Sequence, residues 1–230
     1  MKEISRRNAI GTIAAGTVAT GTIISGGCDS QKTMTKKTLK KYPNEHFYNA
    51  DGSFNADKAK AAYYEMMEFY SYPIVDRIKP DSEEFWTLDF GLGNFMEAGM
   101  AGIFWVNNLE HNYFGHEIYL LPGQMIPEHW HMPTEKAGPK LEGWHLRYGS
   151  VTLYGEGTPT PGVDERIPPL HNKIAKARTE TVLKPGEVGM LSAPKARHFM
   201  LAGPQGAIVS EYATYHDGDG LRFTHPDAKL

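Results

Sequence analysis

Four side chains in the middle of this chain have the types and spacing of a metal site. His129 and His131 are separated by one residue, so both imidazoles point to the same side if that segment is a strand. Glu142 follows after a gap, and His198 adds a third imidazole from a distant segment. Three nitrogens and one oxygen suit a divalent transition metal and leave coordination positions open for a substrate with adjacent oxygens. Such a centre polarises a carbonyl group and stabilises a neighbouring alkoxide. We therefore expect an enzyme.

The carboxylate of this site has two candidates. Glu135 lies nearer to His131 in the sequence, but Pro133 and Pro139 on either side of it indicate a loop. Glu142 opens a strand-like run, and we favour it as the ligand.

Short strands separated by turns are expected to position these residues. Many short strands at regular spacing are typical of an all-β sandwich or barrel. We predict strands at residues 85–90, 102–106, 116–121, 125–131, 143–148, 150–154, 179–183, 188–191, 198–201 and 207–215. The Pro-rich segment 158–178 predicts a long loop between strands.

A helix is predicted ahead of the strands. Between Asn55 and Tyr70, apolar residues recur at helical spacing, and Pro73 follows soon after. We expect this amphipathic helix, within a segment spanning residues 49–84, to pack outside the barrel.

The first 28 residues have the pattern of an export signal. Arg6 and Arg7 precede a weakly apolar run, and small residues precede Cys28, as in Tat-exported lipoproteins. The alternatives are a plain helix or a membrane anchor, but the run is short and rich in Gly, Thr and Ala. We expect export to the periplasmic side, a lipid anchor at Cys28, and a polar tether over residues 29–48.

The composition limits the classes of partner. The chain has 230 residues, of which 40% are hydrophobic and 22% charged, and its net charge is −3. These values indicate one globular domain, and nothing in them favours a nucleic-acid partner. Cys28 is the only cysteine, which excludes an intramolecular disulfide and a cysteine metal site.

The metal residues match a known signature. Gly123, His129, His131, Glu142 and Gly149 fall at the spacings of the first cupin signature in every interval but one, which is longer here. The second signature resembles the segment that ends at His198. The resemblance implies an all-β cupin barrel of the jelly-roll type over residues 85–230.

The segment from Glu211 to Phe223 resembles the D-lyxose isomerase family of cupin sugar isomerases, which carry a strand glutamate, an Asp-rich turn and an Arg-Phe pair near the C-terminus. The resemblance implies aldose–ketose interconversion by enediol proton transfer, a small sugar substrate and a homodimer. It also implies a divalent metal, with Mn²⁺ favoured over Zn²⁺ and Fe²⁺.

The resemblance assigns residue roles as well. The metal ligands would be His129, His131, Glu142 and His198, and Glu211 would be the catalytic base. Asp217, Asp219 and Arg222 would bind sugar hydroxyls or orient Glu211.

Two positions depart from the family pattern. Just after the histidines the family has a Lys-x-Glu-Asp run, where this chain has residues 134–137, and Lys136 is the candidate for a catalytic cation. The family also carries a lysine on the strand before the two histidines, where this chain has a strand that begins at His116 and contains no lysine.

Two other classes of function compete with the isomerase. One is a different metal-dependent cupin enzyme, such as a dioxygenase or a uronate lyase. The other is a saccharide-binding lipoprotein without catalytic activity.

Overall fold

The computed structural model describes residues 38–230. The predicted export signal, and the part of the predicted tether before residue 38, lie outside this range. The helices of the described range are η1 (Asn44–Phe47), α1 (Ala56–Phe69), η2 (Asp76–Ile78), η3 (Val163–Glu165), α2 (Pro169–Asn172) and η4 (Gly218–Gly220). The strands are β1 (Trp86–Leu88), β2 (Met100–Asn108), β3 (Tyr113–Leu120), β4 (Met125–His131), β5 (Glu142–Gly155), β6 (Thr179–Leu183), β7 (Val188–Met190), β8 (His198–Ala213) and β9 (Leu221–Phe223).

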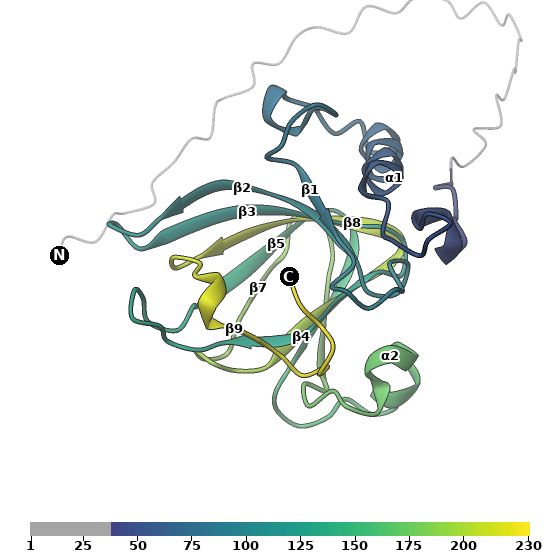
Figure 1. The fold of residues 1–230 in the computed structure, drawn as a ribbon. Coiled ribbons are helices and arrows are strands. Elements are labelled where there is room, and N and C mark those ends of the chain that lie inside the picture. Colours follow the sequence, from purple (N-terminus) through teal and green to yellow (C-terminus); the bar gives the residue numbers. More distant parts are fainter. Residues whose placement is uncertain (1–37) are drawn as a thin grey trace, which may run out of the picture. The chain divides into compact units, whose positions relative to one another are not determined.

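The strands form a single curled sheet, as the all-β prediction requires (Figure 1). Its main path runs β1-β2-β3-β8-β4-β9, and β5 pairs with β6, β7 and β8. Every pairing between these strands is antiparallel. The long strand β8 is central, because residues 207–213 lie between β3 and β5 whereas residues 198–202 pair with β4 and β5.

Alternation along the strands builds two apolar layers. In β3, Ile118 belongs to the core inside the sheet, whereas the next residue, Tyr119, belongs to the core outside it. In β8, Val209 likewise belongs to the core inside the sheet and Ile208 to the core outside it. This division follows directly from the period of two in a strand.

Helix α1 covers part of the outer face, as predicted (Figure 1). Its N-cap is Asn55, whose side chain accepts a hydrogen bond from the backbone N–H of Lys58 at 3.0 Å. Such a cap stabilises a helix by about 1 kcal/mol. Tyr63 and Met66 are fully buried against the sheet. None of the helices in residues 38–230 has the length and apolar character needed to cross a membrane.

Two of the predicted strand breaks are wrong. Residues 143–148 and 150–154 belong to the single strand β5, and residues 198–201 and most of 207–215 belong to β8. The reason is a pair of facing glycines, Gly149 (φ +83°) and Gly206 (φ +73°), which shift the register without ending either strand. A Cβ on Gly149 would lie 2.0 Å from the carbonyl oxygen of Gly206, so only glycine fits there.

The Pro-rich segment 158–178 is anchored to β4 by a buried carboxylate. Glu128 accepts hydrogen bonds from the backbone N–H groups of Lys176 and Ala177 at 2.7 and 2.6 Å. Its own backbone N–H donates to Nε2 of the buried His171 at 3.0 Å. Since Glu128 is next to His129, this anchor also supports the candidate metal site.

His171 is expected to make stability depend on pH. Burial, with a contribution from nearby His225, lowers the pKa of His171 to about 4. The folded protein therefore keeps this imidazole neutral, and stability is lost as the pH falls from 6.5 towards 4 because the unfolded chain binds the proton first. We expect H171Q to remove this loss. The stability advantage of wild type over the variant should therefore be about 3 kcal/mol smaller at pH 4 than at pH 7.

Urea denaturation over this pH range measures the difference. H111Q, at an exposed histidine, is the control and should follow wild type. Identical pH slopes for wild type and H171Q would contradict the prediction.

Candidate metal centre and active site

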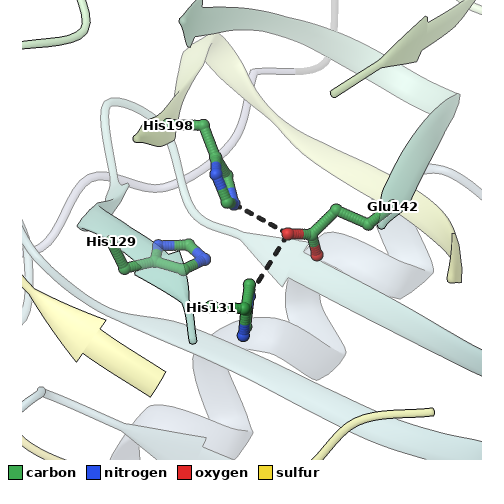
Figure 2. A group of neighbouring side chains, drawn as sticks. All are labelled: His129, His131, Glu142 and His198. Carbon is green, nitrogen blue, oxygen red and sulfur yellow. Dashed lines mark ion pairs between the residues drawn. The ribbon is translucent and has the colours of Figure 1, made fainter. Parts of the chain in front are cut away.

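Three strands bring four potential ligands together (Figure 2). Strand β4 carries His129 and His131 on one side, β5 begins with Glu142, and β8 begins with His198. His129 and His198 are direct partners in the β4–β8 register. One ligand atom from each of the four residues lies within 4.8 Å of all the others. The four residues chosen from the sequence therefore form one compact group.

Unpartnered polar atoms inside this group fit a cation. The Nε2 atoms of His131 and His198 lie 3.2 and 2.9 Å from Oε1 of Glu142. These three atoms are buried and have no other partner in the part of the chain that the structure describes. Nδ1 of His129 donates to the carbonyl of Pro127 at 2.8 Å, which leaves the lone pair of its Nε2 for a metal. The group suits a divalent metal, because a cation would satisfy all four side chains at once.

The charges of the group agree with this interpretation. Burial, with the neighbouring imidazoles of His198 and His131, holds the pKa of His129 well below its usual value. Burial would raise the pKa of Glu142, but Lys140 and His198 outweigh it and hold that pKa well below the usual range. Burial lowers the pKa of His198, whereas Glu142 raises it to a greater extent. Glu142 is therefore ionised and His129 neutral, which are the states in which both side chains bind a divalent metal.

The geometry favours Glu142 over Glu135 as the carboxylate of the group. Glu142 is 2% exposed and lies inside the group, whereas Glu135 is exposed on the loop that follows β4. Backbone hydrogen bonds fix this loop, since the N–H of Met132 donates to the carbonyl of Gly220 and the N–H of Thr134 donates to the carbonyl of Ala137.

A second buried cluster adjoins the first. Nζ of Lys140 bonds to Oε1 of Glu211 and lies 2.9 Å from Oε2 of Glu142. Nδ1 of His116 lies 3.0 Å from Oε2 of Glu211. All four residues of this chain of contacts are at least nine-tenths buried. Lys140 thus connects the predicted base to the metal group.

The second cluster is an ion pair. Burial would raise the pKa of Glu211, but Lys140 and the hydrogen-bonded His116 together outweigh it, so that the pKa is lowered. Burial would lower the pKa of Lys140, whereas Glu142 and Glu211 raise it. Glu211 is therefore an ionised carboxylate, able to accept a proton, and Lys140 is an ammonium group, able to donate one.

Both clusters line the same cavity, whose volume is about 350 Å³. This volume is in the range of small-molecule sites. Aromatic rings make up much of the remaining wall: Trp86, Phe90, Phe104, Phe114, Trp144 and Phe223. The cavity therefore offers ionic groups on one part of its wall and rings for the C–H faces of a ligand on another.

Four of the residues predicted for catalysis or substrate binding do not line this cavity. Lys136 is 56% exposed, and its Nζ lies 3.2 Å from Oδ2 of Asp219. Asp217 accepts hydrogen bonds from Oγ1 of Thr134 and from the backbone N–H of Asp219. Lys136, Asp217 and Asp219 thus fasten the turn at η4 to the loop after β4, and the structure does not bring them to the cavity.

Arg222 is the fourth. It pairs with Trp130 in the β4–β9 register and is exposed, whereas its neighbours Leu221 and Phe223 line the cavity. Alternation in β9 therefore directs Arg222 outward. Its guanidinium donates to the carbonyls of Asp219 and Leu221.

Sequence analysis missed two residues of the site, Lys140 and His116. Lys140 and Glu142 match the first and third positions of the family's Lys-x-Glu-Asp run, with Gly143 in place of the Asp, and the longer loop places them after residues 134–137. The signal in the sequence that identifies Lys140 is its position two residues before Glu142. The alternation of β3 and β8 places His116 opposite Glu211, a pairing that needs the strand register.

Comparisons with known proteins find sugar isomerases among the relatives of this chain. The chain is 36% identical to a D-lyxose ketol-isomerase from Thermofilum sp. over 164 residues, which cover 71% of this chain and 88% of the relative. It is also 36% identical to a D-lyxose/D-mannose isomerase from Thermosediminibacter oceani over 149 residues, covering 65% and 81% of the two chains. No family model matches the chain.

Solved structures show the same fold. The L-ribose isomerase of Cellulomonas parahominis, solved with L-ribose, superimposes with a TM-score of 0.59 at 13% identity and covers 81% of this chain and 96% of that one. The L-ribose isomerase of Acinetobacter sp. DL28 gives a TM-score of 0.58 at 15% identity, with coverages of 80% and 95%.

The metal group predicts a difference between the two candidate carboxylates. We expect E142Q to weaken Mn²⁺ binding by at least about 100-fold, because it removes a charged ligand and leaves the shape unchanged. Isothermal titration calorimetry of the metal-free protein measures the affinity. E135Q is the matched control and should bind as wild type does; a loss confined to E135Q would refute the assignment.

Proposed function

This chain belongs to the D-lyxose ketol-isomerase family, and from that premise we propose that it is a metal-dependent isomerase that interconverts an aldose and a ketose. The names of its relatives make D-lyxose and D-mannose the first substrates to test. The observation that carries the proposal is the ionised Glu211, which lies in the same cavity as the metal group. Family membership favours this function over a dioxygenase, a uronate lyase or a saccharide-binding lipoprotein.

We propose Mn²⁺ as the metal. One carboxylate among three imidazoles raises the affinity for a harder ion than an all-imidazole site would favour, although Zn²⁺ and Fe²⁺ fit the same donors. When bound, the metal would polarise the sugar carbonyl and stabilise negative charge on its oxygen. Activity after reconstitution with each ion separately would rank them.

Glu211 carries the central proton transfer in this proposal. Its carboxylate takes the proton from C2 of the aldose and returns it to C1, which converts the C1 carbonyl into a hydroxyl-bearing carbon and C2 into the ketone carbon. A carboxylate suits this task because it is ionised in the folded protein and has an acidic partner beside it.

Lys140 completes the proton balance. Its ammonium gives a proton to O1 as the enediol forms and recovers one from the O2 hydroxyl as the ketose forms. The enzyme therefore ends the cycle with the protons it began with. The surrounding rings, among them Phe114, whose centroid lies 4.6 Å from Nζ of Lys140, keep water from competing for these protons.

Two further proposals concern the surroundings of the enzyme. We propose export and lipid anchoring at Cys28, which cell fractionation and mass spectrometry of the mature N-terminus would test. We also propose a homodimer. The outward side chains Val182, Val188, Met190 and Tyr212 are each more than half exposed, on strands β6, β7 and β8, which all pair with β5, and burying them in a dimer would be favourable. Sedimentation velocity of wild type and M190K would test it.

Removing the base should abolish turnover without affecting the metal. We expect E211Q to lower kcat by about 10²–10⁴-fold, the usual contribution of a general base, with Mn²⁺ affinity unchanged. Ketose formation from a panel of aldoses, with and without a chelator, measures the activity. Wild-type rates in E211Q, or no turnover of any sugar by the metal-loaded wild type, would overturn the proposal.

Lysine substitutions separate the buried cation from the exposed one. We expect K140M to lower kcat by about 100-fold or more, because the proton donor beside Glu211 is lost. K136M changes the same residue type four positions away on the surface and should retain full activity. K140R, which keeps the charge, tests whether charge alone suffices. Equal effects of K140M and K136M would contradict the role of Lys140.

A further inference from the structure

We propose that His116 is a positioning residue that fixes the plane of the Glu211 carboxylate. This inference rests on the proposed function, in which Glu211 is the base. It assigns a role in the reaction to a histidine that the sequence motifs leave unexplained.

The strand register brings the two side chains together. His116 of β3 and Glu211 of β8 are direct partners in an antiparallel pair, so their side chains leave the sheet on the same face. Nδ1 of His116 lies 3.0 Å from Oε2 of Glu211. Burial lowers the pKa of His116, so the imidazole is neutral and its Nδ1–H donates the hydrogen bond.

The carboxylate is held at both oxygens. Lys140 bonds to Oε1 and His116 bonds to Oε2. The terminal torsion of a glutamate side chain is soft, so one contact alone would leave the carboxylate free to turn about that atom. Two contacts on different oxygens fix its plane, and they leave the remaining lone pairs of both oxygens for the substrate proton.

The imidazole itself is held by rings. Trp86 stacks on His116 with a centroid distance of 5.5 Å, and Phe104 meets it edge-on at 5.0 Å. On the next strand, a Cβ at Gly102 would lie 2.4 Å from Nε2 of His116, so glycine is needed at that position for the imidazole to sit there.

This packing leaves a buried nitrogen without a partner. Nε2 of His116 has no hydrogen-bond partner among residues 38–230, and an unpaired buried polar atom costs about 1–3 kcal/mol. A phenylalanine would fill the same space without that cost. The histidine is therefore explained by the bond that Nδ1 makes to Glu211, and by no stabilising contact of Nε2.

Three substitutions separate positioning from packing. The amide nitrogen of H116N lies near the place of Nδ1 and can still donate to Glu211, whereas that of H116Q lies near Nε2 and cannot. H116F keeps the ring packing and has no donor. We expect kcat to fall by about 10–100-fold in H116F and H116Q, with KM changed less than about threefold, because a misplaced base affects the chemical step more than binding. H116N should recover at least about tenfold in kcat over H116F, although it is less stable to heat.

A purely structural role predicts the opposite order, with H116F the most active variant because it keeps the rings together. Wild-type kcat in H116F, or equal kcat in H116N and H116Q, would overturn the inference. If H116F does not fold, the comparison of H116N with H116Q decides alone. Metal content and circular dichroism are measured for each variant. Full activity of E211Q, or an inactive wild type, would instead remove the proposed function.

Discussion

Two carboxylates buried around one ammonium group are the constraint on which the rest of the site depends. Glu142 and Glu211 both contact Lys140, and all three are at least nine-tenths buried. Burying ions is costly unless they are paired. Together they leave one net negative charge, which a divalent cation on the neighbouring imidazoles would convert into one net positive charge. Negative charge that develops on a sugar oxygen then neutralises the cavity, which favours the transition state over the ground state.

The fold places these groups in the interior because side-chain alternation shifts by one residue within two strands, β5 and β8. His198 and Glu211 are thirteen positions apart on β8, and with strict alternation they would face opposite sides of the sheet. The excursion at residues 203–206 lets both face inward, since Met200 and Ala202 precede it in the interior and Ala207 and Val209 follow. Strand β5 makes a matching shift at Gly149. The glycine pair therefore serves the site as well as the sheet, because it lets one strand supply both a ligand and the base.

These features explain which parts of the fold and of the site are predictable from the sequence. The metal group was predictable, because His129 and His131 depend only on alternation within one strand and Glu142 opens the next. The helix was predictable from its periodicity and from Pro73, which follows it soon after. The family resemblance implies roles for Lys136, Asp217, Asp219 and Arg222, yet these residues, on the loop after β4, at the η4 turn and on β9, lie outside the cavity. Lys140 and His116 depend on loop length and strand register, which a single sequence does not specify. A glycine bulge has the same composition as a glycine turn, so the sequence predicts a strand break where the structure has a continuous strand with a shift in side-chain alternation.

The neutral state of His116 completes the electrostatic argument. The strand that holds it is the one on which the family resemblance places a lysine. A second ammonium beside Glu211 would add a positive charge to the cavity and lower the pKa of the base further, which would make it a poorer proton acceptor. An imidazole donates a comparable hydrogen bond and adds no charge. His116 therefore orients the carboxylate and, through its hydrogen bond, lowers the pKa of Glu211 together with Lys140, without bringing a second ammonium group into the cavity.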